Sequence, residues 1–458
     1  MDQPLRVAVV GAGPAGFYAV DALLKSDIEV RCDLFDRLPT PFGLVRGGVA
    51  PDHQKIKAVA RTYDALARRS EVRFFGNVVV GRDLSVTELA QRYHHIVYAV
   101  GAEDARRLGI EGEDLAGVHD ATDFVGWYNA HPDHQSHTFD LAGSRRVLVV
   151  GNGNVAMDVT RVLSRSPADF ASTDMSARAI GALEGSGIRD VLVVGRRGPA
   201  QAAFSPKEIK EIGSLPDVAL VVAPDEVALD SVSERWLATS APRSAHRNLA
   251  YLTARSQDPP PEPGQRRVQC VFRESPVQFL GTNGRVDRVV LERNELREDA
   301  RGVPRPHPTG QRRTLDIDLV FLAIGYRGVP VPGVPFADGR GIIPNTGGRV
   351  VDPYNNRPLM GQYVVGWAKR GPSGLIGSNA ADSKATVGCM LEDVEQTSPA
   401  PKDPEDLPGI LAARGVRVVT YEDWQRLDAH EREVGEERGK VREKLLSVDA
   451  MLEVLGPA

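Results

Sequence analysis

The stretch L-R-V-A-V-V-G-A-G-P-A-G, residues 5–16, joins a short apolar run to a glycine-rich turn near the start of the chain. The apolar run is typical of a strand buried in a parallel sheet. Residues 17–25 then follow a helical pattern, and residues 30–35 form a second apolar run that ends at Asp36. We therefore predict a strand, a tight turn, a helix and a second strand, which together form the unit that binds dinucleotides.

Each glycine of this turn has its own physical role. Gly11 permits the tight turn, Gly13 lets a pyrophosphate approach the backbone, and Gly16 lets the helix pack closely on the strand. The phosphates then lie at the helix N-terminus, where backbone N–H groups are unpaired. Asp36 comes 20 positions after Gly16, the spacing expected of an acidic residue that binds a ribose hydroxyl. We interpret these four residues as cofactor-binding.

A second unit of the same kind begins with a strand at Arg146. This strand leads into G-N-G-N-V-A, residues 151–156, and a helix follows through Leu163. Alanine at position 156 replaces the third glycine, a variation that dinucleotide-binding turns accept. The sequence therefore predicts two dinucleotide sites in one chain.

A pair of arginines follows the next predicted strand, residues 190–195. Arg196 and Arg197 can form bidentate bonds to a 2′-phosphate, at the place where an NAD site offers an acidic residue. The interval from Ala156 to Arg196 is 40 residues, longer than the usual ~20. We therefore predict an NADP site with an insertion over residues 164–187.

Two further apolar runs end in glycine, at residues 95–101 and 318–325, and they bracket the second unit. A glycine at a strand end brings the backbone close to a ligand or marks a crossing between domains. We predict an α/β fold with two Rossmann-like domains. In this division the FAD-binding domain is discontinuous, residues 1–104 and 325–458, and the NADP-binding domain, residues 105–324, is inserted into it.

The C-terminal part contains a stretch rich in proline and charge, residues 397–408, which predicts a linker. The tail that begins at about residue 409 shows helical patterning from Tyr421 onward.

Composition narrows the class of protein. The 458 residues include 61 acidic and 56 basic side chains, a net charge of −5, so no overall positive field favours nucleic acid. Cys32, Cys270 and Cys389 are too far apart for a C-x-x-C motif, an iron–sulfur ligand set or a zinc ribbon. Redox chemistry must therefore come from a cofactor, and we expect no bound metal. Apolar runs are too short to span a bilayer, and no signal peptide precedes the first strand, so we expect a cytoplasmic protein.

Three long motifs resemble one family. They are P-T-P-F-G-L-V-R-G-G-V-A-P-D-H (residues 39–53), V-G-R-R-G-P-A-Q-A-A-F (residues 194–204) and G-W-A-K-R-G-P-S-G-L-I-G (residues 366–377). Together they closely resemble the adrenodoxin reductase family of NADPH-ferredoxin reductases. The resemblance implies an FAD enzyme that takes hydride from NADPH and passes single electrons to a ferredoxin, which in turn feeds a cytochrome P450 or a similar acceptor. It also favours a monomer.

The resemblance implies specific cofactor contacts. The FAD positions are Ala15, Asp36, Leu44, Val80, Trp367, Gly374, Leu375 and Ile376. The NADP positions are Arg106, Asn152, Gly153, Asn154, Val155, Arg196, Arg197 and Glu208, and Gly374 lies near both cofactors. Family members commonly have glutamate where this chain has Asp36, whose side chain is shorter. The contact with the ribose is therefore either a direct hydrogen bond from this shorter side chain or one mediated by water.

The resemblance also suggests a group that handles protons. It places His53 near the nicotinamide and the flavin, together with Asp158 or Glu211. A histidine can relay the proton that accompanies flavin reduction. The alternative is a structural histidine in a tight loop, and the sequence does not separate the two.

A basic surface is needed to dock an acidic ferredoxin. Arg243, Arg247 and Arg255 recur at near-helical spacing and are our candidates, although a solvated helix face has the same pattern.

Three other classes of protein share the two nucleotide units. A disulfide flavoprotein needs a C-x-x-C motif, and a glutamate-synthase-type subunit needs cysteine-rich segments, so the cysteines argue against both. A nucleotide-sensing protein without turnover stays open.

Overall fold

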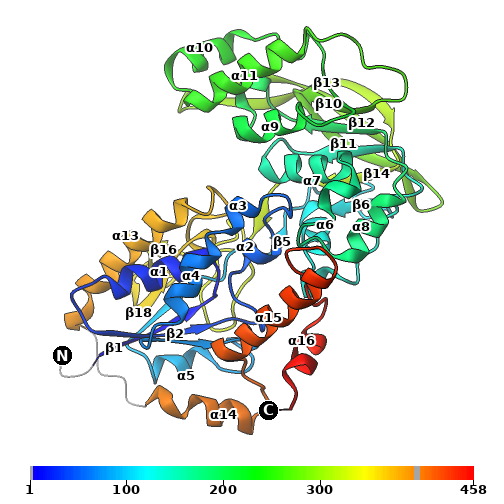
Figure 1. The fold of residues 1–458 in the computed structure, drawn as a ribbon. Helices are drawn as coiled ribbons and strands as arrows, with labels where there is room; N and C mark the ends of the chain where they lie inside the picture. Colours follow the sequence, from blue (N-terminus) through cyan, green and yellow to red (C-terminus); the bar gives the residue numbers. More distant parts are fainter. Residues whose placement is uncertain (1–3, 397–402, 458) are drawn as a thin grey trace.

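The computed structural model describes residues 4–396 and 403–457, and the chain forms two lobes, each built on its own sheet (Figure 1). The first half of the predicted linker, residues 397–402, lies outside the described residues. The rest of it continues into the 3-10 turn Pro404–Asp406 and the start of helix α14 (Leu407–Ala413).

The first lobe contains a seven-stranded sheet. Its order is β16 (Asn345–Thr346), β17 (Arg349–Val351), β18 (Pro358–Val364), β4 (His95–Tyr98), β1 (Leu5–Val10), β2 (Val30–Phe35) and β3 (Val72–Phe75). β18 pairs in parallel with β4, from Gln362 opposite Ile96 to Val364 opposite Tyr98. Strands from both ends of the chain therefore share one sheet.

Helices cover both faces of this sheet. The helices of this lobe are α1 (Pro14–Leu24), α2 (Leu44–Gly47), α3 (Gln54–Lys57), α4 (Ala60–Ala67), α5 (Val86–Ala90), α12 (Trp367–Arg370), α13 (Ser378–Glu392), α14, α15 (Tyr421–Glu437) and α16 (Val448–Leu455). Helix α1 starts with Pro14 at its first turn, where the missing N–H costs no hydrogen bond. Its apolar side places Phe17 and Val20 in the same buried cluster as Val7 and Leu34 of the sheet. The glycine turn is thereby held at the carboxyl end of β1.

The second lobe contains a six-stranded, fully parallel sheet. Its order is β6 (Val118–Asp120), β14 (Leu319–Leu322), β7 (Arg146–Val150), β8 (Asp190–Gly195), β10 (Arg266–Phe272) and β9 (Val218–Val222). An antiparallel sheet of β11 (Glu274–Thr282), β12 (Arg285–Glu298) and β13 (Pro304–Asp316) lies against it. The helices are α6 (Ala121–Tyr128), α7 (Asn154–Ser164), α8 (Ala177–Glu184), α9 (Pro206–Ile212), α10 (Ser231–Thr239) and α11 (Arg243–Arg255).

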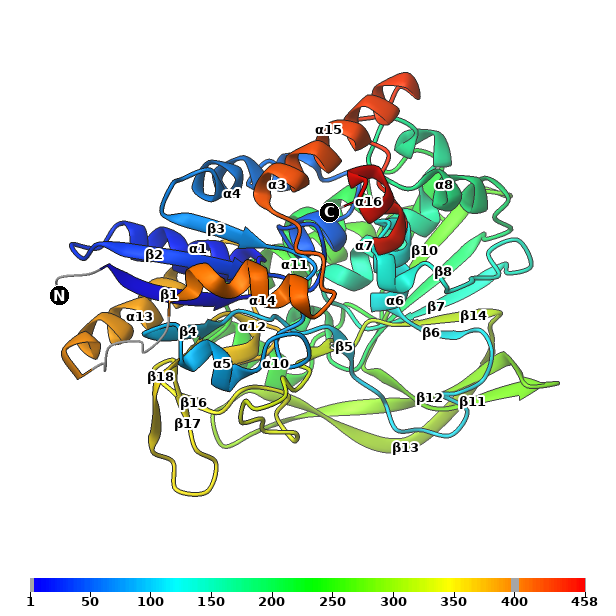
Figure 2. The ribbon, with the colours of Figure 1, turned by 90° about the horizontal axis from the view of Figure 1, so that it is seen from below.

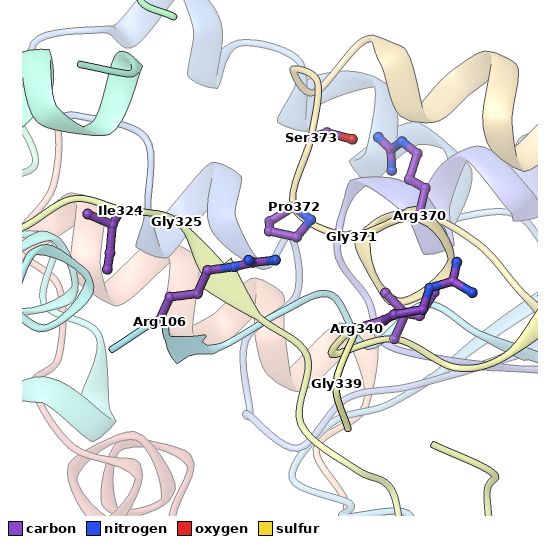
Figure 3. Close-up of a pocket in the computed structure, with 10 residues that line it drawn as sticks. Arg106, Ile324, Gly325, Gly339, Arg340, Arg370, Gly371, Pro372 and Ser373 are labelled. Atoms are coloured by element: carbon purple, nitrogen blue, oxygen red, sulfur yellow. The ribbon is translucent and has the colours of Figure 1, made fainter. Parts of the chain in front are cut away.

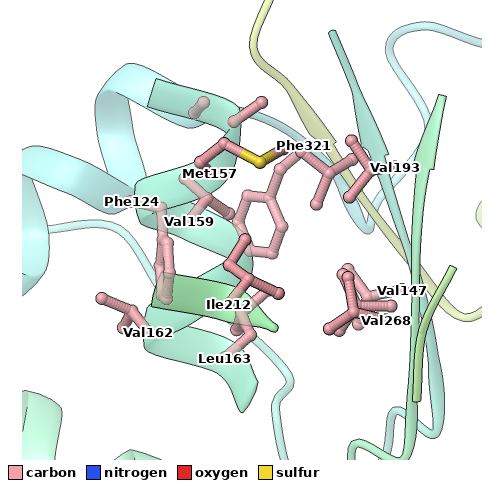
Figure 4. Packing of buried hydrophobic residues seen from close by; sticks show 14 of the residues in the cluster. Phe124, Val147, Met157, Val159, Val162, Leu163, Val193, Ile212, Val268 and Phe321 are labelled. Atoms are coloured by element: carbon pink, nitrogen blue, oxygen red, sulfur yellow. The ribbon is translucent and has the colours of Figure 1, made fainter. Parts of the chain in front are cut away.

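The core of this lobe lies between the parallel sheet and helices α6, α7 and α9 (Figure 4). Phe124, Met157 and Ile212 from the helices meet Val193 and Phe321 from the strands, and all five are buried. Where we predicted an insertion, residues 164–187, the chain forms the 3-10 turn Pro167–Phe170 and helix α8 before it returns to β8.

Two short strands mark the passage between the lobes. β5 (Asp104–Ala105) pairs antiparallel with β15 (Tyr326–Arg327), and Figure 2 shows β5 between the lobes. The predicted domain boundaries, 104 and 325, fall at this pair, and the division itself stays a prediction. The two glycine-ended strands stop earlier than we expected, at Tyr98 and Leu322, because the chain then turns out of the sheet.

Candidate active site

The first glycine turn is fixed by close backbone packing. Gly11 has φ +110°, and a Cβ there would lie 2.4 Å from the carbonyl oxygen of Ala99, while a Cβ on Gly16 would lie 2.1 Å from that of Gly11. A Cβ on Gly13 would meet nothing closer than the Cα of Gly43, at 3.9 Å. Gly11 and Gly16 are therefore required by packing, whereas Gly13 leaves room beside the uncapped N-terminus of α1. This cradle fits a pyrophosphate.

Asp36 closes this turn from the end of β2. Its Oδ2 accepts a hydrogen bond from the N–H of Ala12 at 2.9 Å, and its Oδ1 accepts one from the N–H of Leu38 at 3.0 Å. Burial raises the pKa of the carboxyl group to about 6, although the hydrogen bonds from these two N–H groups act to lower it. Since each carboxylate oxygen accepts more than one hydrogen bond, the geometry still admits the predicted ribose contact, which stays a prediction.

Several of the predicted FAD positions come together around this turn. Gly366 has φ +69°, and a Cβ there would lie 2.6 Å from the Cβ of Ala15, so the segment that starts α12 lies against the turn. Leu44 begins α2 directly after Gly43, which adjoins Gly13. Val80 is buried in one cluster with Val10 and Phe35, the last residues of β1 and β2.

Trp367 follows Gly366 and leaves a polar atom without a partner. Its indole Nε1 is buried and, within the residues that the structure describes, makes no hydrogen bond. The indole ring lies 5.3 Å from the ring of Tyr326, centroid to centroid. Gly374, with φ +84°, turns the next segment so that Leu375 is 65% exposed and Ile376 is half-buried. An unpaired indole N–H beside an exposed loop fits a ring ligand with polar edges.

The second glycine turn repeats the construction of the first. Gly151 has φ +125°, and a Cβ there would lie 2.3 Å from the carbonyl oxygen of Ala323, the residue after β14. A Cβ on Gly153 would have open space, and no side chain caps α7 at this residue. Ala156 is fully buried in place of a third glycine. The second turn therefore also leaves a cradle at a helix N-terminus.

The neighbouring predicted NADP residues lie around this cradle. Oδ1 of Asn154 accepts the N–H of Ser205 at 2.8 Å, which ties α7 to the start of α9. Val155 is partly buried against the core of the lobe. A Cβ on Gly195 would lie 2.5 Å from Nδ2 of Asn152, so the end of β8 adjoins the turn.

Arg196 and Arg197 follow Gly195 and carry positive charge without a carboxylate partner in the described residues. Arg196 is exposed and Arg197 is half-buried. Burial, together with the nearby charges of Arg196 and Arg305, lowers the pKa of Arg197. Because like charges repel, this arrangement is stabilised when an anion binds.

His53 meets its predicted partners in a buried charged cluster. Its Nε2 lies 3.0 Å from Oε2 of Glu211, and its Nδ1 lies 4.0 Å from Oδ1 of Asp158. His53 precedes α3 in the first lobe, whereas Asp158 is on α7 and Glu211 is on α9. The cluster therefore joins the two lobes.

Arg161 is the centre of this cluster, and the sequence reasoning missed it. Its side chain is 1% exposed and lies 2.7 Å from Asp52, 2.6 Å from Asp158 and 3.0 Å from Glu208. The available signal was its position three residues after Asp158 on the same helix, which places both side chains on one face. Asp52, next to His53, was also missed.

The carboxyl groups of the cluster titrate differently. Burial raises the pKa of Asp158, and burial together with Asp158 raises the pKa of Glu208. Burial also opposes ionisation of Glu211, but the hydrogen bond and charge of His53, together with Lys207 and Arg161, outweigh it and lower the pKa of that carboxyl group. The cluster thus contains groups that can hold a proton beside Glu211, which prefers to be ionised, as acid–base sites do.

A cavity of about 470 Å³ lies at the passage between the lobes (Figure 3). Three arginines line it: Arg106, Arg340 and Arg370. The Nε–H of Arg106, a predicted NADP residue, donates to the carbonyl oxygen of Tyr326 at 3.0 Å. Ser373, which precedes Gly374, lines the same cavity. The cavity therefore brings Arg106 close to the loop predicted for FAD.

The predicted docking arginines lie on α11. Arg243 and Arg247 are exposed, while Arg255 is half-buried, pairs with Asp258 at 3.1 Å and lies over the ring of Tyr251. Arg255 is thus already engaged within the chain, whereas Arg243 and Arg247 have no ion-pair partner among the described residues. In the described residues, no helix is long and apolar enough to cross a membrane.

The comparisons with known proteins agree with this geometry. Residues 5–197 match the family model described as pyridine nucleotide-disulphide oxidoreductase. The chain is 43% identical over 464 residues to NADPH-ferredoxin reductase FprA of Mycobacterium tuberculosis, with 99% of each chain covered. It is 40% identical over 459 residues to the mitochondrial NADPH:adrenodoxin oxidoreductase of Arabidopsis thaliana, covering 98% of this chain and 95% of that protein. The solved structure of M. tuberculosis FprA in complex with NADPH has a TM-score of 0.92 at 42% identity, covering 99% of this chain and 100% of the other.

The fold and the two glycine turns therefore define a flavoprotein oxidoreductase that uses FAD and NADP(H). The chain belongs to the adrenodoxin reductase family of NADPH-ferredoxin reductases. Cys32, Cys270 and Cys389 are all free thiols in this structure. Burial raises the pKa of Cys270 to about 12, which keeps that thiol unreactive.

Proposed function

We propose that this chain takes hydride from NADPH onto FAD and passes the electrons one at a time to a ferredoxin. The observation that carries the proposal is the Arg196 and Arg197 pair, which lies beside the second glycine turn with no carboxylate partner in the described residues. Two uncompensated guanidinium groups suit the 2′-phosphate that distinguishes NADPH from NADH. The names of the relatives, NADPH-ferredoxin reductase and NADPH:adrenodoxin oxidoreductase, support the acceptor.

In this proposal the two cradles hold different nucleotides. FAD contacts the first turn (Gly11, Gly13, Ala15 and Gly16), together with Asp36, Leu44, Val80, Trp367, Gly374, Leu375 and Ile376. NADP(H) contacts Arg106, Asn152, Gly153, Asn154, Val155, Arg196, Arg197 and Glu208.

FAD supplies the chemistry that the side chains lack, because it accepts hydride and releases single electrons. The chain positions the two nucleotides and manages the proton. We assign this task to His53, which holds a proton at Nε2 and exchanges it with Oε2 of Glu211, 3.0 Å away. Asp158, whose pKa burial raises, serves as a second proton store near Nδ1 of the same ring.

The acceptor side of the proposal rests on surface charge. An acidic ferredoxin docks on Arg243 and Arg247, with Arg255 at the margin, since complementary charge raises the rate of encounter. We include in the proposal a cytochrome P450 or a similar enzyme that takes electrons from the ferredoxin, and a monomeric reductase.

Anaerobic titration tests this function directly. We expect NADPH to bleach the flavin absorption band, NADH to bleach it far less efficiently, and the reduced protein to reduce a ferredoxin, followed through the ferredoxin spectrum. Addition of a cytochrome P450 and its substrate then tests the terminal step. A protein without flavin, or one whose flavin does not bleach with NADPH, would refute the reductase and favour the nucleotide-sensing alternative.

A further inference from the structure

One carboxylate and two imidazoles form a compact group outside the active site. Asp123 lies in the first turn of α6, His134 ends the 3-10 turn Pro132–His134, and His137 follows three residues later. Nδ1 of His134 is 3.2 Å from Oδ1 of Asp123, and Nε2 of His137 is 3.6 Å from the same oxygen. The donor atoms of all three side chains lie within 4.8 Å of one another.

These separations match those of metal ligands. A tetrahedral ion with ligand bonds of about 2.0–2.1 Å holds neighbouring ligand atoms about 3.4 Å apart. The two observed distances to Asp123, 3.2 and 3.6 Å, lie on either side of that value. The three side chains could therefore bind one ion with only small changes of rotamer.

The helix surface is shaped to receive the ring of His134. A Cβ on Gly126 of α6 would lie 2.1 Å from Cδ2 of this ring and 2.9 Å from its Nε2. Glycine at this position thus lets the imidazole lie against the helix, with Nδ1 facing Asp123. Any larger residue at position 126 would displace the ring and its donor atom.

The charge of Asp123 also lacks a permanent counterion. Among the described residues, its ion-pair contacts are with His134 and His137, and no arginine or lysine lies within 4.0 Å of it. All three side chains are partly exposed, so an ion and a water ligand can reach them. A cation between these groups would bond two imidazole nitrogens and neutralise the carboxylate.

We propose that Asp123, His134 and His137 bind a divalent transition-metal ion of the Zn²⁺ type, with water completing its coordination. Imidazole with carboxylate suits zinc, whereas Mg²⁺ and Ca²⁺ prefer ligand sets made of oxygen. This proposal departs from our expectation of no metal, which rested on cysteine spacing. The H-x-x-H spacing of residues 134–137 was the signal in the sequence.

The site lies where the second lobe contacts the first. Asp133, next to His134, pairs across 2.6 Å with Arg37, two residues after the end of β2. A Cβ on Gly47 of α2 would lie 2.8 Å from Cδ2 of His131, so this turn packs directly on the first lobe. An ion that fixes the turn therefore stabilises the contact between the lobes, and zinc should raise the thermal unfolding temperature.

Calorimetric titration of the full-length holoprotein with ZnCl₂, after treatment with a chelator and gel filtration, tests the proposal. We expect one equivalent of zinc to bind and to raise the unfolding temperature. His134→Ala and His137→Ala should each weaken zinc binding by at least about tenfold, since even residues that only support a ligand contribute 10–100-fold. Circular dichroism and flavin content verify that both variants are folded.

Two controls separate this site from other sources of zinc binding. His246→Ala removes an exposed histidine of α11, and Glu211→Gln removes one member of the His53, Glu208 and Glu211 group, whose donor atoms also lie within 4.8 Å of one another. Both variants should bind zinc as the wild type does. The proposal is overturned if the wild type takes up no zinc, if His134→Ala and His137→Ala retain its affinity, or if Glu211→Gln alone abolishes binding.

Discussion

The Nε–H group of Arg161 donates to Oδ2 of Asp52 across 2.7 Å, and this ion pair crosses from the second lobe to the first. The same guanidinium group also bonds Asp158 and Glu208. One buried cation therefore balances carboxylates from both lobes and sets the surroundings of His53.

Replacement of Arg161 by methionine removes the positive charge but keeps most of the side-chain volume. The carboxylates of Asp158 and Glu208 would then be buried without their cation, and Asp52 would keep only Arg165, 2.9 Å away. This change should lower the free energy of unfolding by about 3–5 kcal/mol. Urea denaturation measures the loss. The matched control is Arg285→Met, because Arg285 pairs with Asp140 where both side chains are more than 40% exposed; it should cost no more than about 1 kcal/mol. Equal losses in the two variants would contradict the central role of Arg161.

The pKa of Asp36, raised to about 6 by burial, predicts a pH dependence of stability. Between pH 4 and 7 the folded chain binds the proton more tightly than the unfolded chain, so the free energy of unfolding falls as pH rises. The wild type should lose about 2.4 kcal/mol relative to Asp36→Asn over this range. The measurement is urea denaturation of flavin-stripped protein at several pH values.

The control for this experiment is Asp21→Asn, which alters a carboxylate paired with Lys25 on the surface of α1. The difference in free energy of unfolding between the wild type and Asp21→Asn should not change in this way as pH rises. A stability difference between wild type and Asp36→Asn that is constant from pH 4 to 7 would mean that the buried carboxyl group is not perturbed.

Lys444 connects the C-terminal segment to both lobes. Its side chain is 1% exposed; Nζ lies 2.9 Å from Asp174 and donates to the carbonyl oxygens of Arg46 and Asn129. Lys444→Met should therefore lower the free energy of unfolding by about 3 kcal/mol. Lys25→Met, which breaks an exposed pair, should cost less than about 1 kcal/mol when measured by the same denaturation. If both variants unfold like the wild type, the tail does not hold the lobes together.

The arginine pair should decide between the two nicotinamide nucleotides. Each charge-assisted hydrogen bond contributes about 1.5–3 kcal/mol, so Arg196→Ala with Arg197→Ala should raise the Kd for NADPH at least about 100-fold. The Kd for NADH should hardly change, because NADH has no 2′-phosphate. Arg267→Ala, which removes a guanidinium group paired with Asp190 on the same sheet, serves as the control. If the double variant lost affinity for NADPH and NADH by the same factor, Arg196 and Arg197 would not be the residues that bind the 2′-phosphate.

The exposed arginines of α11 should guide the ferredoxin. Charge reversal by Arg243→Glu with Arg247→Glu should slow ferredoxin reduction by at least about tenfold at low salt and flatten its salt dependence. Reduction of ferricyanide, a small acceptor, should be unchanged in the same variant. Arg288→Glu on the antiparallel sheet reverses another surface charge and should have little effect. If ferredoxin reduction depends equally weakly on salt in all three proteins, docking occurs elsewhere.

Local sequence patterns predicted much of the framework. The predicted strands at residues 30–35 and 146–150 coincide with β2 and β7, because continuous apolar runs between turn residues leave little alternative. The glycine-ended strands were predicted too long. Gly101 and Gly325 have φ +74° and +107°, so the backbone leaves the sheet before it reaches them. Helix α1 starts at Pro14, earlier than predicted, because proline suits the first helical turn.

The candidate site was only partly predictable. The motif that contains His53 directed attention to that residue, and the structure brings His53 to Asp158 and Glu211. Arg161 was missed because a charged residue on a helix usually faces solvent. The same expectation hid the proposed metal ligands. Asp123 lies on a helix, and the two histidines lie at a turn and shortly after it, where polar side chains usually face solvent.

The sequence by itself determined the two dinucleotide units, because a glycine turn, its helix and its flanking strands interact within a few tens of residues. The tertiary structure alone decided the charged cluster between the lobes. Asp52 and Arg161 are 109 positions apart, and their contact depends on how two separately built sheets face each other. Local sterics and hydrogen bonding act along the chain and can be read from it, whereas the neutralisation of a buried charge depends on partners that only the completed fold supplies.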